Sequence, residues 1–170
     1  MILDGMTAIP KGFGGFNANV RWKDLSLSMS WAYRYGAYVW NEAVEQISND
    51  GYYTFHRNIA ASQVDTWSPS NPNGTQPIRI VGNNQGGYYY SSRYISKADF
   101  LRLKDLTLSY NVPRALLNKI NVVGARVYVS GTNLITFANT DIDPEVTVNG
   151  RYRYGMPALR SVSFGLEVSF

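Results

Sequence analysis

Hydrophobic and polar residues alternate one by one along several long stretches of this chain. In residues 25–36 the odd positions hold only Leu, Met, Trp and Tyr, whereas the even positions hold Ser, Ala, Arg and Gly. A period of two places successive side chains on opposite faces of a β-strand, whereas a helix repeats every 3.6 residues. The same alternation predicts five strands, at residues 13–22, 25–36, 100–112, 125–137 and 159–170.

The alternation changes phase once, inside the predicted strand 100–112. Leu101 and Leu103 occupy odd positions, but from Leu106 onward the large apolar residues occupy even positions. One extra residue in the strand restores a common apolar face, and a β-bulge supplies such a residue. We therefore predict a bulge at residues 104–105.

The connections between the predicted strands alternate in length. Those at 23–24 and 113–124 are short, and those at 37–99 and 138–158 are long. Bacterial outer-membrane barrels have this layout, with short turns on the periplasmic side and long loops on the extracellular side. Local patterns add weak helical segments at 41–48 and 58–67, and one helical turn at 113–119 that begins with Pro113.

The two faces of the predicted sheet differ in chemistry. The polar face carries Ser, Asn, Thr and Gly with few charges, which suits a hydrated barrel lumen better than the surface of a soluble sheet. On the other face Leu, Val and Met lie between aromatic residues at both strand ends, as in a lipid-facing barrel wall. We therefore predict an all-β fold, in which antiparallel up-and-down strands form a segment of a transmembrane β-barrel. The predicted membrane girdles are Trp22, Tyr110 and Phe170 at the inner ends and Tyr33, Tyr35 and Phe137 at the outer ends.

Composition narrows the function classes. The 170 residues include 16% charged and 45% hydrophobic residues, a single His and no Cys, which excludes disulfide scaffolds and Cys-ligated zinc. The net charge of +4 is spread along the chain without a cluster of Lys and Arg, so nucleic-acid binding is not expected. No apolar run reaches the ~18–20 residues of a transmembrane helix. No catalytic or nucleotide-binding motif occurs, and we expect neither an enzyme nor a cofactor.

Several segments resemble one known family. The C-terminal end of SusC/RagA-type TonB-linked outer-membrane proteins of Bacteroidetes is similar to "FLRLKDLTLSYNVPRALL", "ARVYVSGTNLITF", "DIDPEV" and "SVSFGLEVSF". The family's preceding strands and loop resemble "GFGGFNANVRWKDLSLS" and "DTWSPSNPN", in the same order. The resemblance covers nearly the whole chain from about Lys11, and its most specific part is residues 100–137.

This resemblance implies a plugged barrel of roughly 22 strands, placed in the outer membrane and surrounded by its lipid. Such a barrel imports oligosaccharide or peptide fragments, is powered by TonB through its N-terminal region, and is covered by a SusD-like lipoprotein. Five strands do not close a barrel of that size. Residues 1–170 are therefore expected to be a C-terminal fragment of the barrel domain that is not active alone.

Aromatic residues in the loop 37–99 are candidates for contact with substrate or with the lipoprotein lid, because rings offer a large contact area at low entropic cost. The alternative is that they pack the loop onto the rim of the barrel. The candidates are Tyr52, Tyr53, Trp67, Tyr88, Tyr89 and Tyr90.

Three arginines fall on the polar side of their strands and are candidates for lining the lumen. They are Arg21, Arg34 and Arg126. Charged groups in such a setting need partners. These arginines therefore either line a path for an anionic substrate or pair with acidic residues of the plug.

A short acidic motif lies in the loop 138–158. Asp141, Asp143 and Glu145 have a spacing of oxygen ligands that suits Ca²⁺, but the glycine and the loop length of a calcium-binding motif are missing. We therefore favour a solvated loop, or one paired with arginine, over a metal site, and Arg151 and Arg153 are the nearest arginines in the sequence.

Two other functions remain open on the residue pattern. A soluble β-sandwich, such as a carbohydrate-binding module, also has alternating strands, and so does a small autonomous outer-membrane barrel or adhesin. A binding module stays soluble without detergent, whereas the membrane proteins require it. An odd number of strands with unpaired edges favours the fragment over a small closed barrel.

Overall fold

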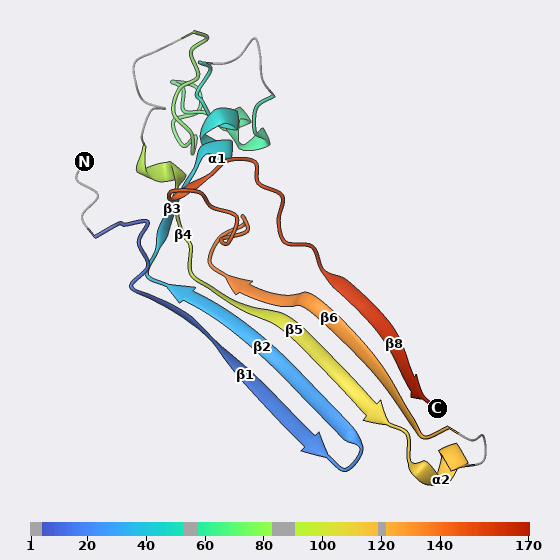
Figure 1. Ribbon diagram of the computed structural model, residues 1–170. Helices are drawn as coiled ribbons and strands as arrows, with labels where there is room; N and C mark the ends of the chain where they lie inside the picture. Colours follow the sequence, from blue (N-terminus) through green and yellow to red (C-terminus); the bar gives the residue numbers. More distant parts are fainter. Residues whose placement is uncertain (1–4, 53–57, 83–90, 119–121) are drawn as a thin grey trace.

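The computed structural model describes residues 5–52, 58–82, 91–118 and 122–170 (Figure 1). Five long strands form one sheet in the order β1-β2-β5-β6-β8, and all neighbours in it are antiparallel. The sheet is thus an up-and-down meander, and every strand end lies within two residues of its predicted position. The strands are β1 (Gly12–Trp22), β2 (Leu25–Tyr35), β5 (Phe100–Asn111), β6 (Gly124–Ala138) and β8 (Ser161–Ser169).

The strand register confirms the predicted bulge in β5. Trp31 of β2 lies opposite Leu103, whereas the residue before it lies opposite Asp105, so Lys104 is the extra residue. Side chains on both sides of the bulge therefore return to the same face of the sheet. The neighbouring strand β6 has a second irregularity at the same level, where Asn133 adopts a left-handed φ of 52°.

The inner end of the sheet holds the two short connections (Figure 1). Lys23 makes the tight β1–β2 turn with a φ of 53°. Between β5 and β6, α2 (Arg114–Leu117) follows Pro113 at its N-cap. The helical turn expected from residues 113–119 is therefore present. None of the helices in the described ranges has the length and hydropathy that a membrane-spanning helix needs.

The described parts of the long connections fold together at the opposite end of the sheet, into what we call the outer cap (residues 37–52, 58–82, 91–99 and 139–158). Figure 1 shows β7, which comes from the second connection, beside β3 from the first. This second sheet, in the order β4-β3-β7, was not predicted, because both connections were expected to be irregular apart from two helical patches. The cap contains β3 (Tyr38–Asn41), α1 (Glu42–Ile47), η1 (Ala61–Val64), η2 (Ser92–Tyr94), β4 (Ile95–Lys97) and β7 (Arg151–Tyr152).

The buried apolar core is small and lies where the sheet meets the cap. Ala37, Val39 and Ala98 are buried there, with Ile142 and Tyr152 packed against them. Along the long strands, by contrast, many large apolar side chains are exposed to the outside. A soluble β-sandwich buries such a face against a second sheet, so the exposed face argues against that alternative.

Candidate surfaces for lipid, substrate and partner contact

The strand register arranges the apolar face in rows that run across the sheet. Opposite residues share a face, and both end regions of the apolar face hold aromatic residues. The rows between them are mainly aliphatic but also include Phe16, Trp31 and Phe164. The innermost row contains Trp22, Leu25, Tyr110, Val127 and Leu166, the next row Val20, Leu27, Leu108, Val129 and Phe164, and an outer row Tyr33, Leu101 and Phe137.

The residues predicted to form girdles are all exposed. Tyr35 lies two residues beyond Tyr33 on the same face, opposite Gly12, and Phe170 follows the end of β8 with 92% of its surface accessible. Leu25 and Tyr35 are roughly 34 Å apart at ~3.4 Å per residue. With a strand tilt of ~40°, this length covers roughly 26 Å along a membrane normal, close to the ~25 Å apolar band of outer-membrane barrels.

The inner half of the polar face carries two of the predicted lumen arginines. Arg21 and Arg126 line one hollow of about 280 Å³, together with small residues that include Ser28, Thr107 and Ser109. Arg126 Nη2 donates to Ser109 Oγ at 3.3 Å. The hollow is therefore polar, roomy and cationic at its rim.

The outer half of the same face carries an arginine that the sequence analysis did not single out. Arg102 Nη2 lies 2.8 Å from Asp143 Oδ1, its Nη1 contacts Glu145, and its Nε donates to Thr136 Oγ1 at 2.9 Å. The side chains of Arg102 and Asp143 are only 4% and 5% exposed. Lys104 Nζ adds a contact of 2.7 Å to Glu145. We call Arg102, Lys104, Asp143 and Glu145 the outer ion cluster.

Asp143 is held as a carboxylate. Burial raises the pKa of this group, but hydrogen bonds donated by Arg102 and by backbone N–H groups outweigh that effect. The N–H groups are those of Ala158, at 2.8 Å, and Glu145, at 3.0 Å. The net pKa of Asp143 therefore lies below its ordinary value.

Arg34, the third predicted lumen arginine, fastens the same loop. Its Nε donates to the carbonyl of Ala98 at 3.2 Å, and its Nη2 contacts the carbonyl of Pro144. Pro144 is fully buried. The acidic loop is therefore fixed over the outer ends of β2 and β5 by two arginines of the sheet, Arg34 and Arg102.

The acidic motif does not pair with the arginines nearest in the sequence. Arg153 Nε lies 2.7 Å from Glu42 of α1, and Arg151 Nη1 lies 4.0 Å from it. Asp141 is exposed and belongs to no ion pair of the described residues. Within the described part of the chain, no three His, Asp or Glu residues are grouped in a way that would hold a metal ion.

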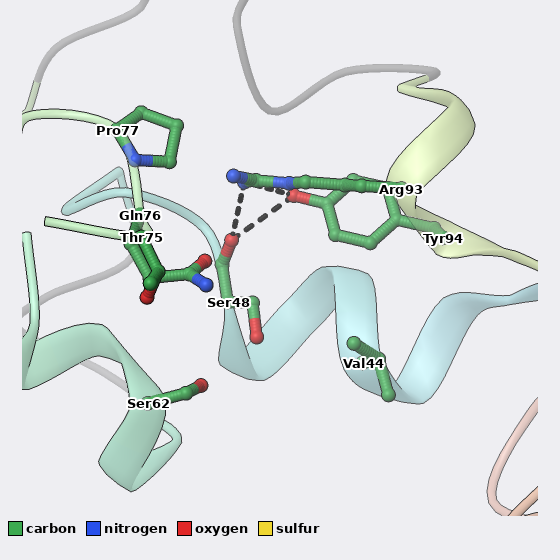
Figure 2. Close-up of a pocket in the computed structure, with 8 residues that line it drawn as sticks. All are labelled: Val44, Ser48, Ser62, Thr75, Gln76, Pro77, Arg93 and Tyr94. Carbon is green, nitrogen blue, oxygen red and sulfur yellow. Dashed lines mark hydrogen bonds between the residues drawn. The ribbon is translucent and has the colours of Figure 1, made fainter. Parts of the chain in front are cut away.

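The outer cap contains a cavity of about 430 Å³ (Figure 2). Figure 2 shows Arg93 lying along the ring of Tyr94, with both polar ends near the carbonyl of Ser48. Arg93 Nη2 donates to that carbonyl at 2.7 Å and pairs with Asp50 at 2.7 Å. Arg93 is thus a structural tie that joins η2 to the end of α1. The cavity is lined by Val44, Ser48, Ser62, Thr75, Gln76, Pro77, Arg93 and Tyr94.

Neither of the two predicted aromatic contact residues that the structure describes lines this cavity. Trp67 is 45% exposed on the cap, and Tyr52 is half-buried. The remaining candidates, Tyr53 and Tyr88, Tyr89 and Tyr90, lie outside the described residues.

Known proteins with similar sequences are receptors. No family model matches the chain. TonB-dependent receptor P3 of Formosa agariphila is 29% identical over 168 residues, which cover 92% of this chain and 16% of the receptor. TonB-dependent receptor P26 of the same organism is 30% identical over 174 residues, covering 95% of this chain and 17% of the receptor. The chain thus spans about one sixth of the length of these relatives.

Solved structures of RagAB are similar over almost the whole chain. The RagAB peptide transporter superposes with a TM-score of 0.82 at 27% identity, covering 97% of this chain and 18% of the matched chain. The RagAB peptide importer in its open-open state gives 0.80 at 26% identity, with the same coverage. These matches confirm the predicted fold class, an antiparallel segment of a β-barrel. Together with the sequence relatives, they support the predicted assignment of this chain to a segment of a SusC/RagA-type TonB-dependent receptor.

Proposed function

We propose that this chain forms part of the wall of an outer-membrane barrel that imports oligosaccharide or peptide fragments. The observation that carries the proposal is the exposed apolar face, bounded by aromatic rows at both ends and backed by a polar face. This combination suits a wall between lipid and a hydrated lumen. The relatives named as TonB-dependent receptors, and the RagAB peptide transporter, support import as the activity of the whole protein.

The partners follow from the same assignment. The apolar face contacts outer-membrane lipid, with Trp22, Tyr110 and Phe170 at the periplasmic interface and Tyr33, Tyr35 and Phe137 at the extracellular one. The outer cap faces the cell exterior, where a SusD-like lipoprotein and the substrate make contact. TonB acts through a region of the receptor outside these residues, and the chain carries out no catalysis. By itself this segment transports nothing, because five strands do not enclose a lumen.

The experiment compares two neighbouring substitutions in β6 of the intact receptor. Val129 lies in the second row from the inner end of the apolar face, and Ser130 projects from the opposite face. Val129→Arg places a charge in the lipid between the inner interface and the bilayer centre, at a cost of about 1–2 kcal/mol, whereas Ser130→Arg places it in water. We expect Val129→Arg alone to reduce folded receptor in the outer membrane and uptake of labelled substrate. Equal tolerance of both substitutions would refute the proposal.

A further inference from the structure

We propose that Arg21 and Arg126 bind carboxylate side chains from a segment of the receptor that lies outside these 170 residues. This inference rests on the proposed function, which places the polar face of the sheet inside the barrel. It selects one of two roles that the sequence leaves open for these arginines. The other role, contact with an anionic substrate, becomes an outcome of the test below.

The first step is the unsatisfied charge of the inner arginines. Arg21 Nε donates only to the backbone carbonyl of Lys23, at 3.4 Å, and none of the ion pairs among the described residues includes it. Arg126 lies 3.6 Å from Glu167, but the two side chains are 43% and 59% exposed. An exposed pair at that distance contributes little. Both cations therefore have capacity for another partner.

The second step is a comparison within the same face of the sheet. At the outer end, Arg102 binds two carboxylates, Asp143 and Glu145, which are separated by a single residue. Asp143 is nearly as buried as Arg102 itself, so the polar face is covered there by an acidic loop. At the inner end an equally polar surface is hollow, and the small side chains Ser28, Thr107 and Ser109 leave room for a covering segment.

The third step is that the inner connections of this chain do not supply the missing acids. The β1–β2 turn contains Asp24, which joins none of the ion pairs among the described residues. The β5–β6 connection, residues 112–123, contains no Asp or Glu at all. The whole chain has 16 Lys and Arg against 12 Asp and Glu. More than four fifths of the relatives' length lies outside the matched segment, so the rest of the receptor is long enough to supply a covering acidic segment.

The geometry at the outer end specifies what the covering segment looks like. Two acidic residues separated by one residue place both carboxylates on one arginine, as Asp143 and Glu145 do. We therefore expect an acidic pair with this spacing to contact the inner arginines. A covered arginine with such partners loses contact with water, and the hollow beside it closes.

The test uses cysteine labelling of the intact receptor in sheared outer-membrane vesicles, with a sulfonated, membrane-impermeant maleimide. The segment itself contains no Cys, and any cysteine in the rest of the receptor is first replaced. Thr107→Cys reports on the hollow, and Leu108→Cys is its matched control on the apolar face. We expect Thr107→Cys to react at least tenfold more slowly than in the unfolded receptor. Adding Arg21→Gln and Arg126→Gln should bring the labelling rate of Thr107→Cys most of the way back to that in the unfolded receptor.

Each outcome decides between the two roles. If Thr107→Cys reacts at the unfolded rate, or if the arginine substitutions leave a protected rate unchanged, the inference is wrong. It is equally wrong if protection appears only after a glutamate-rich hexapeptide is added, because the arginines then serve a substrate. The control separates this inference from the proposed function, since free labelling of Leu108→Cys would show that the apolar face does not contact lipid.

Discussion

The outer and inner halves of the polar face carry the same residue type but differ in how it is neutralised. At the outer half, Arg34 and Arg102 are covered by the acidic loop, and Arg102 is only 4% exposed. At the inner half, Arg21 and Arg126 remain at the rim of an open hollow. Burial of an arginine requires hydrogen-bonded carboxylates close by, and among the residues that the structure describes only the outer half has them.

The difference follows from the lengths of the connections. The outer connections are long enough to fold back over the sheet, so Asp143 and Glu145 reach Arg102, some forty residues earlier in the chain. The inner connections are much shorter, namely the turn at residues 23–24 and the link at residues 112–123. As in outer-membrane barrels, the long loops lie on one side only. The segment therefore supplies acidic residues to the arginines at that end of the polar face.

The largest effect is expected from Arg102→Gln. This substitution leaves the buried Asp143 carboxylate without its cation, and breaking a buried pair in this way costs about 3–5 kcal/mol. Hydrogen exchange of the Ala158 N–H, which donates to Asp143, measures the detachment of the loop. Exchange at this amide should accelerate strongly in Arg102→Gln and not in Arg21→Gln. Equal rates in both variants would show that the outer ion cluster does not hold the loop.

Acid should release the same loop without any substitution. The pKa of Asp143 is lower in the folded protein than in the unfolded chain, whose ordinary value is about 3.9. Its stabilising contribution is therefore fully present above that value and is lost as pH falls through the lowered folded pKa. The protection factor of the Ala158 N–H should be constant from about pH 7 to 5 and fall only below about pH 4. A decrease that begins near neutral pH would contradict this assignment.

Lys104→Gln should loosen the acidic loop less than Arg102→Gln or acid does. The Lys104 and Glu145 side chains are 34% and 25% exposed, and Glu145 keeps its contact with Arg102. A partly exposed pair contributes about 0.2–1 kcal/mol. We expect a modest increase in exchange at residues 143–146, weakened further by 1 M salt. An increase in hydrogen exchange as large as that in Arg102→Gln would mean that Lys104, rather than Arg102, fixes the loop.

Arg126→Gln should change the isolated segment least. Its pair with Glu167 spans 3.6 Å between exposed side chains, so the expected cost is below about 0.5 kcal/mol. Thermal unfolding in detergent micelles, beside the wild-type segment, measures this difference. The same substitution should matter more in the intact receptor, where the proposed acidic segment is present.

The sheet itself was predictable, because its signal is local. Alternation over ten or more residues identifies a strand and its apolar face, and the change of phase located the bulge at Lys104. The small sheet of the cap was missed because β3, β4 and β7 have only two to four residues. Such lengths do not establish a period. These strands form because distant backbone segments meet, as when Trp40 pairs with Arg151.

The partners of the charged residues were less predictable. Proximity in the sequence favoured Arg151 and Arg153 for the acidic motif, whereas folding brings these residues to Glu42. The one available signal was Arg102 itself, a lone cation between Leu101 and Leu103. Because its two neighbours, Leu101 and Leu103, belong to the apolar face, Arg102 must point to the polar face. Which acidic residues cover it becomes visible only in the folded loop.

Quenching of tryptophan fluorescence by lipids with brominated acyl chains tests the orientation of the sheet most directly. The four Trp residues divide evenly, with Trp22 and Trp31 on the apolar face and Trp40 and Trp67 in the cap. Four variants of the segment in phosphatidylcholine vesicles, each keeping one Trp and replacing the others by Phe, report on each site separately. Strong quenching of Trp31, weaker quenching of Trp22 and almost none of Trp40 and Trp67 is the predicted result. Equal quenching at all four sites, or a folded monomer that stays in solution without lipid or detergent, would contradict a lipid-facing sheet.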